Sequence, residues 1–205
     1  MRRALLFLFF LCFALALGCR RAIPNLDSPG TAIVAFGDSI TEGVGSAGPG
    51  TTYPEQLAER LGRPVVNLGV SGDTTAEGLA RIDQVIAEDP WLVVVELGGN
   101  DLLHQVPIER TEANFDAILE RLLAARVVPV LVEIRGPLFG GRYRDLFERL
   151  RDRYHVPLIE DALPDVLSDP ALKSDEIHPN AAGYAKLAEA VARELAPILA
   201  RRGKR

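Results

Sequence analysis

A serine at the end of a buried strand is the first feature of this sequence that could do chemistry. Residues 33–36 (Ile-Val-Ala-Phe) are typical of a buried strand, and the chain then continues as Gly-Asp-Ser, which places Ser39 in the loop after the strand. A serine hydroxyl becomes a strong nucleophile only when a base, normally a histidine, accepts its proton, and a carboxylate must orient that histidine. Such a set attacks carbonyl carbon atoms, so a catalytic Ser39 requires both partners elsewhere in the chain.

His178 has the best surroundings of the three histidines for the role of the base. In the segment Ser-Asp-Glu-Ile-His-Pro, Asp175 precedes it by three residues, close enough to bind its Nδ1. Pro179 keeps His178 out of helical geometry and starts the last predicted helix, whose first turn Asn180 is placed to cap. Taken alone, this segment could equally be a capping turn with an incidental histidine, so its role depends on the other parts of the site.

The other titratable residues near these segments have weaker surroundings. His104 lies on the expected side of the sheet, but the only acid near it in sequence is Asp101. His155 is expected at the opposite edge of the sheet, in a structural position at the end of a helix. Asp38 precedes the serine and is expected to support the turn, because an anion beside Ser39 would compete for the imidazole of the base.

Two further segments could supply the hydrogen-bond donors that an oxyanion needs. Gly72, in Gly-Val-Ser-Gly-Asp-Thr-Thr, could offer a backbone N–H that no side chain shields, and Asn100, in Leu-Gly-Gly-Asn-Asp, could present its amide. A glycine-rich turn and a helix-capping asparagine are the alternatives for each segment alone. They are weaker together, because all four segments are expected at the same edge of one sheet.

The elements that must position these residues are short apolar runs separated by helical patterns. Continuous apolar runs, typical of strands covered on both faces, occur at 32–37, 64–68, 91–97, 127–133 and 156–160. The spacing i, i+3, i+4, i+7 of amphipathic helices is found for three sets: Phe115, Ile118, Leu119 and Leu122; Tyr143, Leu146, Phe147 and Leu150; Tyr184, Leu187, Ala188, Val191 and Leu195. Alternating strands and helices predict a three-layer α/β/α domain with a five-stranded parallel sheet, whose reactive loops follow the carboxyl ends of the strands.

Three other segments have simpler interpretations. Residues 43–48 match the dinucleotide pattern G-x-G-x-x-G, but they neither leave a strand directly nor open a helix, so a flexible loop is expected. Trp91 opens a predicted buried strand and is expected in the core. Residues 135–142 (Arg-Gly-Pro-Leu-Phe-Gly-Gly-Arg) are the best candidate for a loop that lines a substrate groove.

The composition is that of one globular domain. A length of 205 residues with 48% hydrophobic residues suits one well-filled core and leaves little room for a second. The formal net charge is −5, so a basic surface for nucleic acid is not expected, and nucleic acid is excluded as a partner.

The first residues predict export and a lipid anchor. Arg2 and Arg3 precede an apolar run at 4–18 that ends in small residues, which indicates a signal peptide over residues 1–18, too short for a comfortable membrane span. Leu-Ala-Leu-Gly-Cys resembles a bacterial lipobox, which implies cleavage before Cys19 and its lipidation. The alternative is a soluble exported protein with a stray thiol. Residues 19–30 are expected to form a tether and residues 31–202 the folded domain.

Four segments in order resemble the sequence blocks of the SGNH, or GDSL, hydrolases: Gly-Asp-Ser, Ser-Gly-Asp, Gly-Gly-Asn-Asp and Asp-Glu-Ile-His-Pro. The resemblance spans nearly the whole mature chain and implies a flavodoxin-like SGNH fold. It implies Ser39 as nucleophile, His178 as general base and Asp175 as the partner of the base. The implied oxyanion donors are the Ser39 N–H, the Gly72 N–H and the Asn100 amide, and no metal or cofactor is implied.

Two longer segments, at 71–82 and 140–150, resemble the bacterial periplasmic branch of acyl-thioesterases, arylesterases and lysophospholipases. The function expected from this resemblance is hydrolysis of carboxylic esters or thioesters, including lysophospholipids, by a monomer anchored in the cell envelope and facing the periplasm. A soluble periplasmic protein is the alternative for location. A carbohydrate O-acetyl esterase with a more polar groove and a non-catalytic surface lipoprotein are the alternatives for function.

Overall fold

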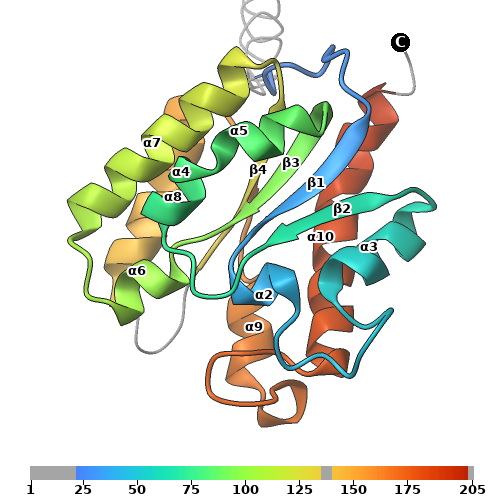
Figure 1. Cartoon of the computed structure of the whole chain (residues 1–205), viewed down its shortest axis with the longest axis vertical. Helices are drawn as coiled ribbons and strands as arrows, with labels where there is room; N and C mark the ends of the chain where they lie inside the picture. Colours follow the sequence, from blue (N-terminus) through green and yellow to red (C-terminus); the bar gives the residue numbers. More distant parts are fainter. Residues whose placement is uncertain (1–21, 135–139, 203–205) are drawn as a thin grey trace, which may run out of the picture.

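The computed structural model describes residues 22–134 and 140–202. Within them, a five-stranded parallel sheet in the order β2-β1-β3-β4-β5 has helices on both faces (Figure 1). The strands are β1 Ala32–Gly37, β2 Val65–Gly69, β3 Pro90–Glu96, β4 Val128–Val132 and β5 Leu158–Ile159. This three-layer α/β/α arrangement with a flavodoxin-like strand order confirms the predicted fold class.

The inner strands are apolar on both faces because helices cover both. All seven residues of β3 and all five of β4 are buried. In β1 only the first residue is partly exposed. The last residue of β1, Gly37, is in register with Gly69 of β2 and Glu96 of β3. These three strands therefore end at the same level, and the loops that follow them meet at one edge of the sheet.

The fifth strand is shorter than the sequence predicts. Of residues 156–160 only Leu158 and Ile159 pair with β4, whereas the other four strands lie within one residue of their predicted bounds. Pro157 has no N–H to donate to a ladder, and Glu160 is exposed where the chain leaves the sheet. An apolar run at the edge of a sheet therefore overstates the length of the paired segment.

Nine helices are formed by the described residues, with one short 3₁₀ helix. They are α2 Ser39–Glu42, α3 Tyr53–Leu61, α4 Thr75–Ala80, α5 Ile82–Ala87, α6 Gly99–Leu103, α7 Ile108–Ala124, α8 Gly140–Tyr154, α9 Ala162–Ser168 and α10 Ala181–Arg202, and the 3₁₀ helix is Pro170–Leu172. Helices α4, α5, α7 and α8 cover one face of the sheet, while α3 and α10 pack against each other on the other face (Figure 1).

The helical spacing in the sequence correctly identifies the buried faces of α7, α8 and α10. Every apolar residue predicted from that spacing is buried, from Phe115 in α7 to Leu195 in α10. Trp91 is fully buried, as predicted, and the Arg202 guanidinium lies over its ring, 4.2 Å from the centroid. Burial of each such side chain contributes roughly 1.5–3 kcal/mol to stability, so these stripes hold the helices on the sheet.

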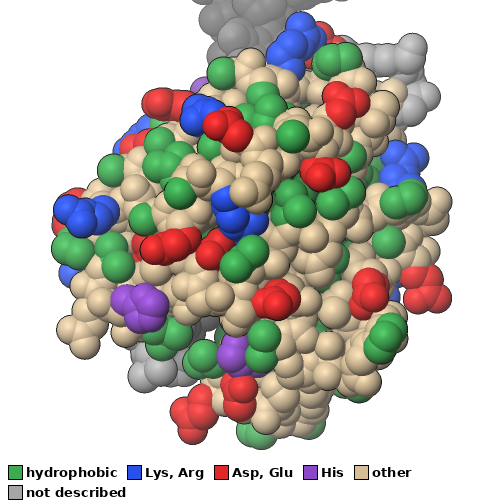
Figure 2. Space-filling model, viewed as in Figure 1, with side chains coloured by type: hydrophobic (Ala, Val, Ile, Leu, Met, Phe, Trp, Pro, Cys, Tyr) green, Lys and Arg blue, Asp and Glu red, His purple; other side chains and the backbone are tan. Residues whose placement is uncertain are grey.

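Charged side chains of both signs are interspersed over the face shown in Figure 2. One pair on the helices of this side of the sheet joins Arg121 of α7 to Asp83 of α5. Exposed pairs of this kind contribute about 0–1 kcal/mol each, so the apolar core accounts for most of the stability.

Residues 22–30, which belong to the tether predicted at 19–30, lie against the domain. Ile23 and Leu26 pack against the core, and the Asn25 amide donates to the carbonyl oxygens of Leu123 at 3.0 Å and Val127 at 2.9 Å. These carbonyls lie at the end of α7 and just before β4, and that of Leu123 also accepts the Arg126 N–H at 3.0 Å, so Asn25 ties the segment to the turn between these two elements. The predicted signal peptide and Cys19 lie outside the described residues, and among the described helices none is long and apolar enough to cross a membrane.

The G-x-G-x-x-G segment is a loop, as its context in the sequence predicts. Gly43 ends α2 in the left-handed region, with φ of 106°. The chain does not enter α3 until Tyr53, so this pattern neither leaves a strand nor opens a helix. Residues 135–139, which make up most of the predicted groove-lining loop, lie outside the described residues.

Candidate active site

Ser39 lies at the edge of the sheet where β1, β2 and β3 end. It is the first residue of α2, and only 9% of its surface is exposed. Asp38 caps this helix, because its Oδ1 accepts the Ile40 N–H at 3.0 Å. This agrees with the expected support of the turn, and the cap holds the serine at a fixed position directly after the strand.

His178 and Asp175 lie in line with Ser39, although His178 follows it by 139 residues. His178 Nε2 is 3.0 Å from Ser39 Oγ, and His178 Nδ1 is 2.8 Å from Asp175 Oδ2. A proton on Nδ1 that is donated to Asp175 leaves Nε2 free to accept the serine proton. The structure therefore brings together the three residues that the sequence assigns to the nucleophile, the base and its partner.

Asp175 is fixed by its own backbone as well as by the imidazole. Its Oδ1 accepts the N–H groups of Ile177 and His178, both at 2.9 Å. Partial burial raises the pKa of Asp175, but these bonds and His178 outweigh that effect and bring it below its usual range. Asp175 is thus held as a carboxylate although about half of its side chain is exposed.

The turn that carries His178 is fastened to its surroundings by Asn180. Its Oδ1 accepts the N–H groups of Ala182 and Gly183, both at 3.0 Å, so Asn180 caps α10 as predicted. Pro179 does not start this helix, since α10 begins at Ala181, and instead pairs with Lys173 in an isolated bridge. The reason is that the asparagine cap occupies the position between the proline and the helix.

Gly45 allows the loop after α2 to lie against the turn of His178. Its φ is 85°, and a Cβ there would clash with Ser174 and lie 2.7 Å from the Pro179 carbonyl oxygen. Tyr184 of α10 donates to the Val44 carbonyl oxygen at 2.6 Å and holds the loop in the same place. Loop and turn thus fix the distance between the serine and the histidine.

Of the three predicted oxyanion donors, the Ser39 N–H belongs to the nucleophile itself, and Asn100 and Gly72 lie on the segments that follow β3 and β2. The Asn100 amide donates to Asp38 Oδ2 at 3.2 Å and to the Asp73 carbonyl oxygen at 3.0 Å. Gly72 adjoins Asp73, is exposed, and has φ of 87°. Asn100 does not cap a helix, because Gly98 is the N-cap of α6 and the amide points to other partners. Both amide hydrogens have acceptors, so binding an oxyanion requires one of these bonds to be shared or exchanged.

A family model identifies the chain. The model described as "GDSL-like Lipase/Acylhydrolase family" matches residues 35–186. The chain belongs to this family. The match begins inside β1 and ends in α10, so it includes all the residues described above.

Relatives of this GDSL-like hydrolase carry names of esterases and thioesterases. "Thioesterase 1/protease 1/lysophospholipase L1" of Escherichia coli (strain K12) is 32% identical over 82% of this chain and 84% of its own length. "Esterase TesA" of Pseudomonas aeruginosa is 32% identical over 92% of this chain and 96% of its own length. The crystal structure of TesA has a TM-score of 0.75 and 30% identity, covering 82% of this chain and 99% of that chain. These findings confirm that the chain is a hydrolase with esterase activity.

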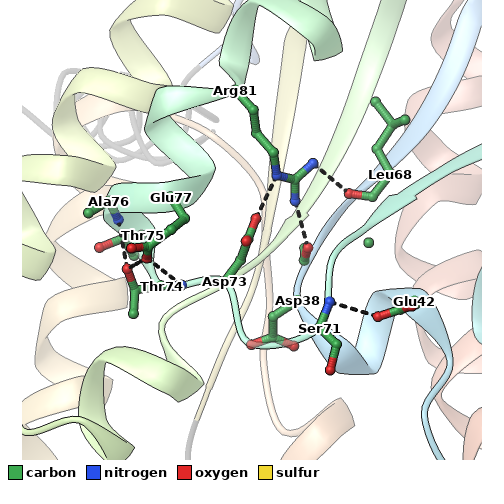
Figure 3. A network of polar contacts seen from close by, with 12 residues as sticks. Asp38, Glu42, Leu68, Ser71, Asp73, Thr74, Thr75, Ala76, Glu77 and Arg81 are labelled. Atoms are coloured by element: carbon green, nitrogen blue, oxygen red, sulfur yellow. Dashed lines mark hydrogen bonds and ion pairs between the residues drawn. The ribbon is translucent and has the colours of Figure 1, made fainter.

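Arg81 is a residue of this GDSL-like hydrolase that the sequence analysis missed. Its Nε is 2.5 Å from Asp73 Oδ2, and its two terminal nitrogens donate to the carbonyl oxygens of Leu68 and Gly37, both at 2.9 Å (Figure 3). One guanidinium thus joins the ends of β1 and β2 to the loop of Gly72. Arg81 lies between α4 and α5 in a stretch that also contains Glu77 and Asp83, so no pattern in the sequence marks it.

The loop of Gly72 is also held from α2 and α6. The Ser71 N–H donates to Glu42 Oε2 at 2.7 Å, which ties the loop to the helix of the serine (Figure 3). Asp101, fully buried, accepts the N–H of Thr75 at 2.7 Å and the hydroxyl of Thr111 at 3.0 Å. These bonds use both oxygens of Asp101, so this acid orients the loop.

The remaining histidines of this hydrolase lie apart from the line of catalytic candidates. His104 is exposed at the end of α6. His155 is exposed at the opposite edge of the sheet and directly follows α8, as predicted. Its φ is 55°. Among the described residues, no group of three or more His, Cys, Asp or Glu side chains is arranged to hold a metal ion.

Two buried carboxyl groups lie behind the serine. Burial raises the pKa of Asp38 to about 6, although the Ile40 N–H and other partners lower it. Burial and the neighbouring Asp38 raise the pKa of Glu96 well above its usual range. Nothing in the sequence predicted a role for Glu96, which reads as one polar residue in an apolar strand.

Proposed function

We propose that this GDSL-like hydrolase cleaves carboxylic esters and thioesters through an acyl-enzyme formed on Ser39. The observation that carries the proposal is the continuous line from Ser39 Oγ through His178 to Asp175, with distances of 3.0 and 2.8 Å. These are the distances at which a serine proton can pass to a histidine that a carboxylate orients.

In the first half of the reaction Ser39 Oγ attacks the acyl carbon while its proton passes to His178 Nε2. The oxyanion that forms accepts hydrogen bonds from the backbone N–H groups of Ser39 and Gly72 and from the Asn100 amide. When the intermediate collapses, the alcohol or thiol leaves with the proton from Nε2, and the acyl group remains on Ser39 as an ester. Asp175 stabilises the imidazolium during these steps.

In the second half a water molecule gives a proton to His178 Nε2 and attacks the acyl-enzyme carbonyl. The same donors stabilise the second oxyanion. Its collapse breaks the bond to Ser39, which regains its proton from the imidazolium, and releases the carboxylic acid. The chain's own residues suffice for both halves, so the proposal requires neither a metal nor a cofactor.

An apolar acyl group is the substrate feature that the surroundings favour. Val70 and Leu103 are the large hydrophobic residues of the described chain that are exposed, at 43% and 46%, and they follow Gly69 and Asn100 at the edge of the site. A cavity of about 380 Å³ opens beside α6 and α7, where the apolar side chains of Leu102, Val106, Pro107, Ile108 and Tyr143 line it together with Gln105, Glu109 and Arg142. Together they offer apolar surface to an acyl chain.

We further propose that the protein is exported and anchored through Cys19 as a monomer that faces the periplasm. The support is the sequence Leu-Ala-Leu-Gly-Cys after a basic start and an apolar run. Ile23, which packs against the core, lies four residues after the cysteine, so an anchor would hold the domain close to the membrane surface.

The experiment uses a fluorophosphonate probe and p-nitrophenyl esters of increasing acyl length. Covalent labelling that is lost in Ser39→Ala, with activity beyond acetyl, is the expected result. Resistance of the wild-type protein to the probe would favour the non-catalytic lipoprotein. A steep loss of activity beyond acetyl esters would favour the carbohydrate O-acetyl esterase instead.

A further inference from the structure

Glu96, the last residue of β3, is a fully buried acid that the mechanism above does not use. Its Oε2 accepts the Thr41 hydroxyl at 2.9 Å, and Thr41 in turn lies 3.3 Å from the Tyr53 hydroxyl. Its Oε1 is buried and accepts no hydrogen bond from any described residue. A buried carboxylate oxygen without a donor is costly, whereas a protonated oxygen needs an acceptor instead.

Asp38 is the acceptor next to Glu96. Gly37 and Glu96 are in register on neighbouring strands, and Asp38 follows Gly37, so the two carboxyl groups meet at the end of the sheet and interact directly. Asp38 is 3% exposed, and both of its oxygens already accept donors: Ile40 N–H on Oδ1 and the Asn100 amide on Oδ2.

Two adjacent buried carboxyl groups cannot both ionise, because each charge raises the cost of the other. The donors decide which group keeps the proton. Asp38 has an N–H donor on each of its oxygens and faces the His178 imidazole, and all of these favour its charged form. Glu96 has the Thr41 hydroxyl and the backbone N–H of Asp38 as donors, and they leave its Oε1 without one. The proton therefore belongs on Glu96, on the oxygen that accepts no other donor.

We propose that Glu96 is a positioning residue for ester hydrolysis: as a neutral carboxylic acid it donates a hydrogen bond to Asp38, which holds the Asn100 amide and the first turn of α2. This inference rests on the proposed roles of Ser39 and Asn100. A proton shared with Asp38 also reduces the negative charge close to the position of the oxyanion, where a full carboxylate charge would oppose its formation.

An amide in place of each carboxyl group should have opposite effects, because a protonated carboxyl group is a hydrogen-bond donor and a carboxylate is not. This difference provides the test. Glu96→Gln keeps a donor for Asp38 and an acceptor for Thr41, so kcat on p-nitrophenyl butyrate should stay within about threefold of wild type. Asp38→Asn has one acceptor oxygen for three donors, so kcat should fall about 10- to 100-fold, as expected for loss of a charged hydrogen bond, with KM little changed. For Glu96→Ala, we expect a decrease in kcat of the same size as for Asp38→Asn.

Glu133→Ala is the matched control. Glu133 is 2% exposed, directly follows β4, and accepts the Asp161 N–H at 3.1 Å. It should lower the urea midpoint about as much as Glu96→Ala does, while kcat stays within about threefold of wild type. An equal loss of kcat in both alanine variants, or a loss in Glu96→Gln as large as that in Glu96→Ala, would overturn the proposal. So would an active Asp38→Asn beside an inactive Glu96→Gln, which would place the proton on Asp38.

A second measurement does not depend on activity. The folded wild-type protein keeps a proton on Glu96, whereas the unfolded chain loses this proton near pH 4. The free energy of unfolding of the wild type therefore falls as pH rises, with a slope that is steeper than that of Glu96→Gln by the contribution of about one proton. The other groups that face the pair are Asp73, which is bound to Arg81, His178, Tyr53 and Tyr184, and all are present in both proteins. A flatter dependence of the urea midpoint on pH in Glu96→Gln, measured between pH 6 and 8, is expected. Equal slopes would overturn the neutral acid even if Ser39 proves not to be catalytic.

Discussion

The imidazole of His178 is held at both ring nitrogens, by Asp175 on one side and Ser39 on the other. At the scale of the residue, this arrangement gives each group one task, because Nδ1 has an acceptor that keeps its proton and Nε2 has only the serine hydroxyl. His178 and Asp175 together activate Ser39, which among the described side chains is the one placed to attack an acyl carbon.

Ser39→Ala should abolish the acyl-enzyme and leave the fold intact. The serine is 9% exposed and its hydroxyl bonds to His178, so its loss removes one hydrogen bond and no part of the apolar core. Activity on an activated ester should drop at least about 10³-fold, since oxyanion donors and binding alone leave little catalysis. A variant that keeps more than about a hundredth of wild-type kcat would exclude Ser39 as the nucleophile.

Asn100→Ala tests the oxyanion donor separately from the nucleophile. Loss of one preorganised donor typically lowers kcat about 10²- to 10³-fold, with KM nearly unchanged because the charge exists mainly in the transition state. The fluorophosphonate should still label Ser39, only more slowly. Measuring kcat and the urea midpoint on one preparation distinguishes an oxyanion donor from a structural residue. An unchanged kcat with a lowered midpoint would exclude Asn100 as an oxyanion donor.

At the scale of the element, three strand ends and the turn before α10 supply the site, and hydrogen bonds keep the loops after the strands in place. The loop of Gly72 is tied to α2 through Glu42 and to the strand ends through Arg81, whose side chain is 13% exposed. The pair of Arg81 and Asp73 is therefore mostly out of water. Breaking such a pair from one side leaves an uncompensated charge.

Arg81→Ala should destabilise the protein and loosen the Gly72 loop. Removing one partner of a buried pair costs about 3–5 kcal/mol, and kcat should fall as well, because the oxyanion donors lose their support. Arg121→Ala is the control: its pair with Asp83 is exposed, so it should cost at most about 1 kcal/mol and leave kcat unchanged. Urea midpoints and kcat of both variants check this, and equal midpoints would contradict a structural role for Arg81.

At the scale of the whole molecule, the proposed anchor and the packed segment at 22–30 concern the same end of the chain. Cys19→Ser should move the protein from the membrane fraction to the soluble fraction or leave the signal uncleaved, with the domain still active. Fractionation of cells followed by mass spectrometry of the amino terminus checks this prediction. Native protein found wholly in the soluble fraction with an unmodified thiol would contradict the anchor.

The start of the folded domain can be tested with shortened chains. A chain that begins at residue 22 keeps the Asn25 bonds to Leu123 and Val127 and the packing of Ile23 and Leu26. A chain that begins at residue 31 loses both, so its free energy of unfolding should be lower by about 0.5–1.5 kcal/mol for each lost hydrogen bond, and its urea midpoint should be lower as a result. Equal midpoints would show that the packing of this segment adds nothing to the stability of the domain.

The sequence by itself determined the strands, the buried faces of the long helices and the four segments of the site. Those features are local: a buried strand needs a continuous apolar run, a helix needs its 3.6-residue period, and Asp175 and His178 meet because they lie three residues apart. The strand ends that precede Ser39, Gly72 and Asn100 predicted that these residues lie at one edge of the sheet, and the family resemblance then implied their roles.

Only the tertiary structure decided which polar residues support that edge. Arg81, Glu96 and Asn25 find their partners 8 to 102 residues away in sequence or on a neighbouring strand, and no local pattern marks them. Glu96 in particular reads as an irregularity in an apolar strand until the register of β1 and β3 sets it against Asp38. The physical reason is that burial and strand register are properties of the folded chain alone. Strand register brings Glu96 next to Asp38, and burial raises the pKa of both carboxyl groups.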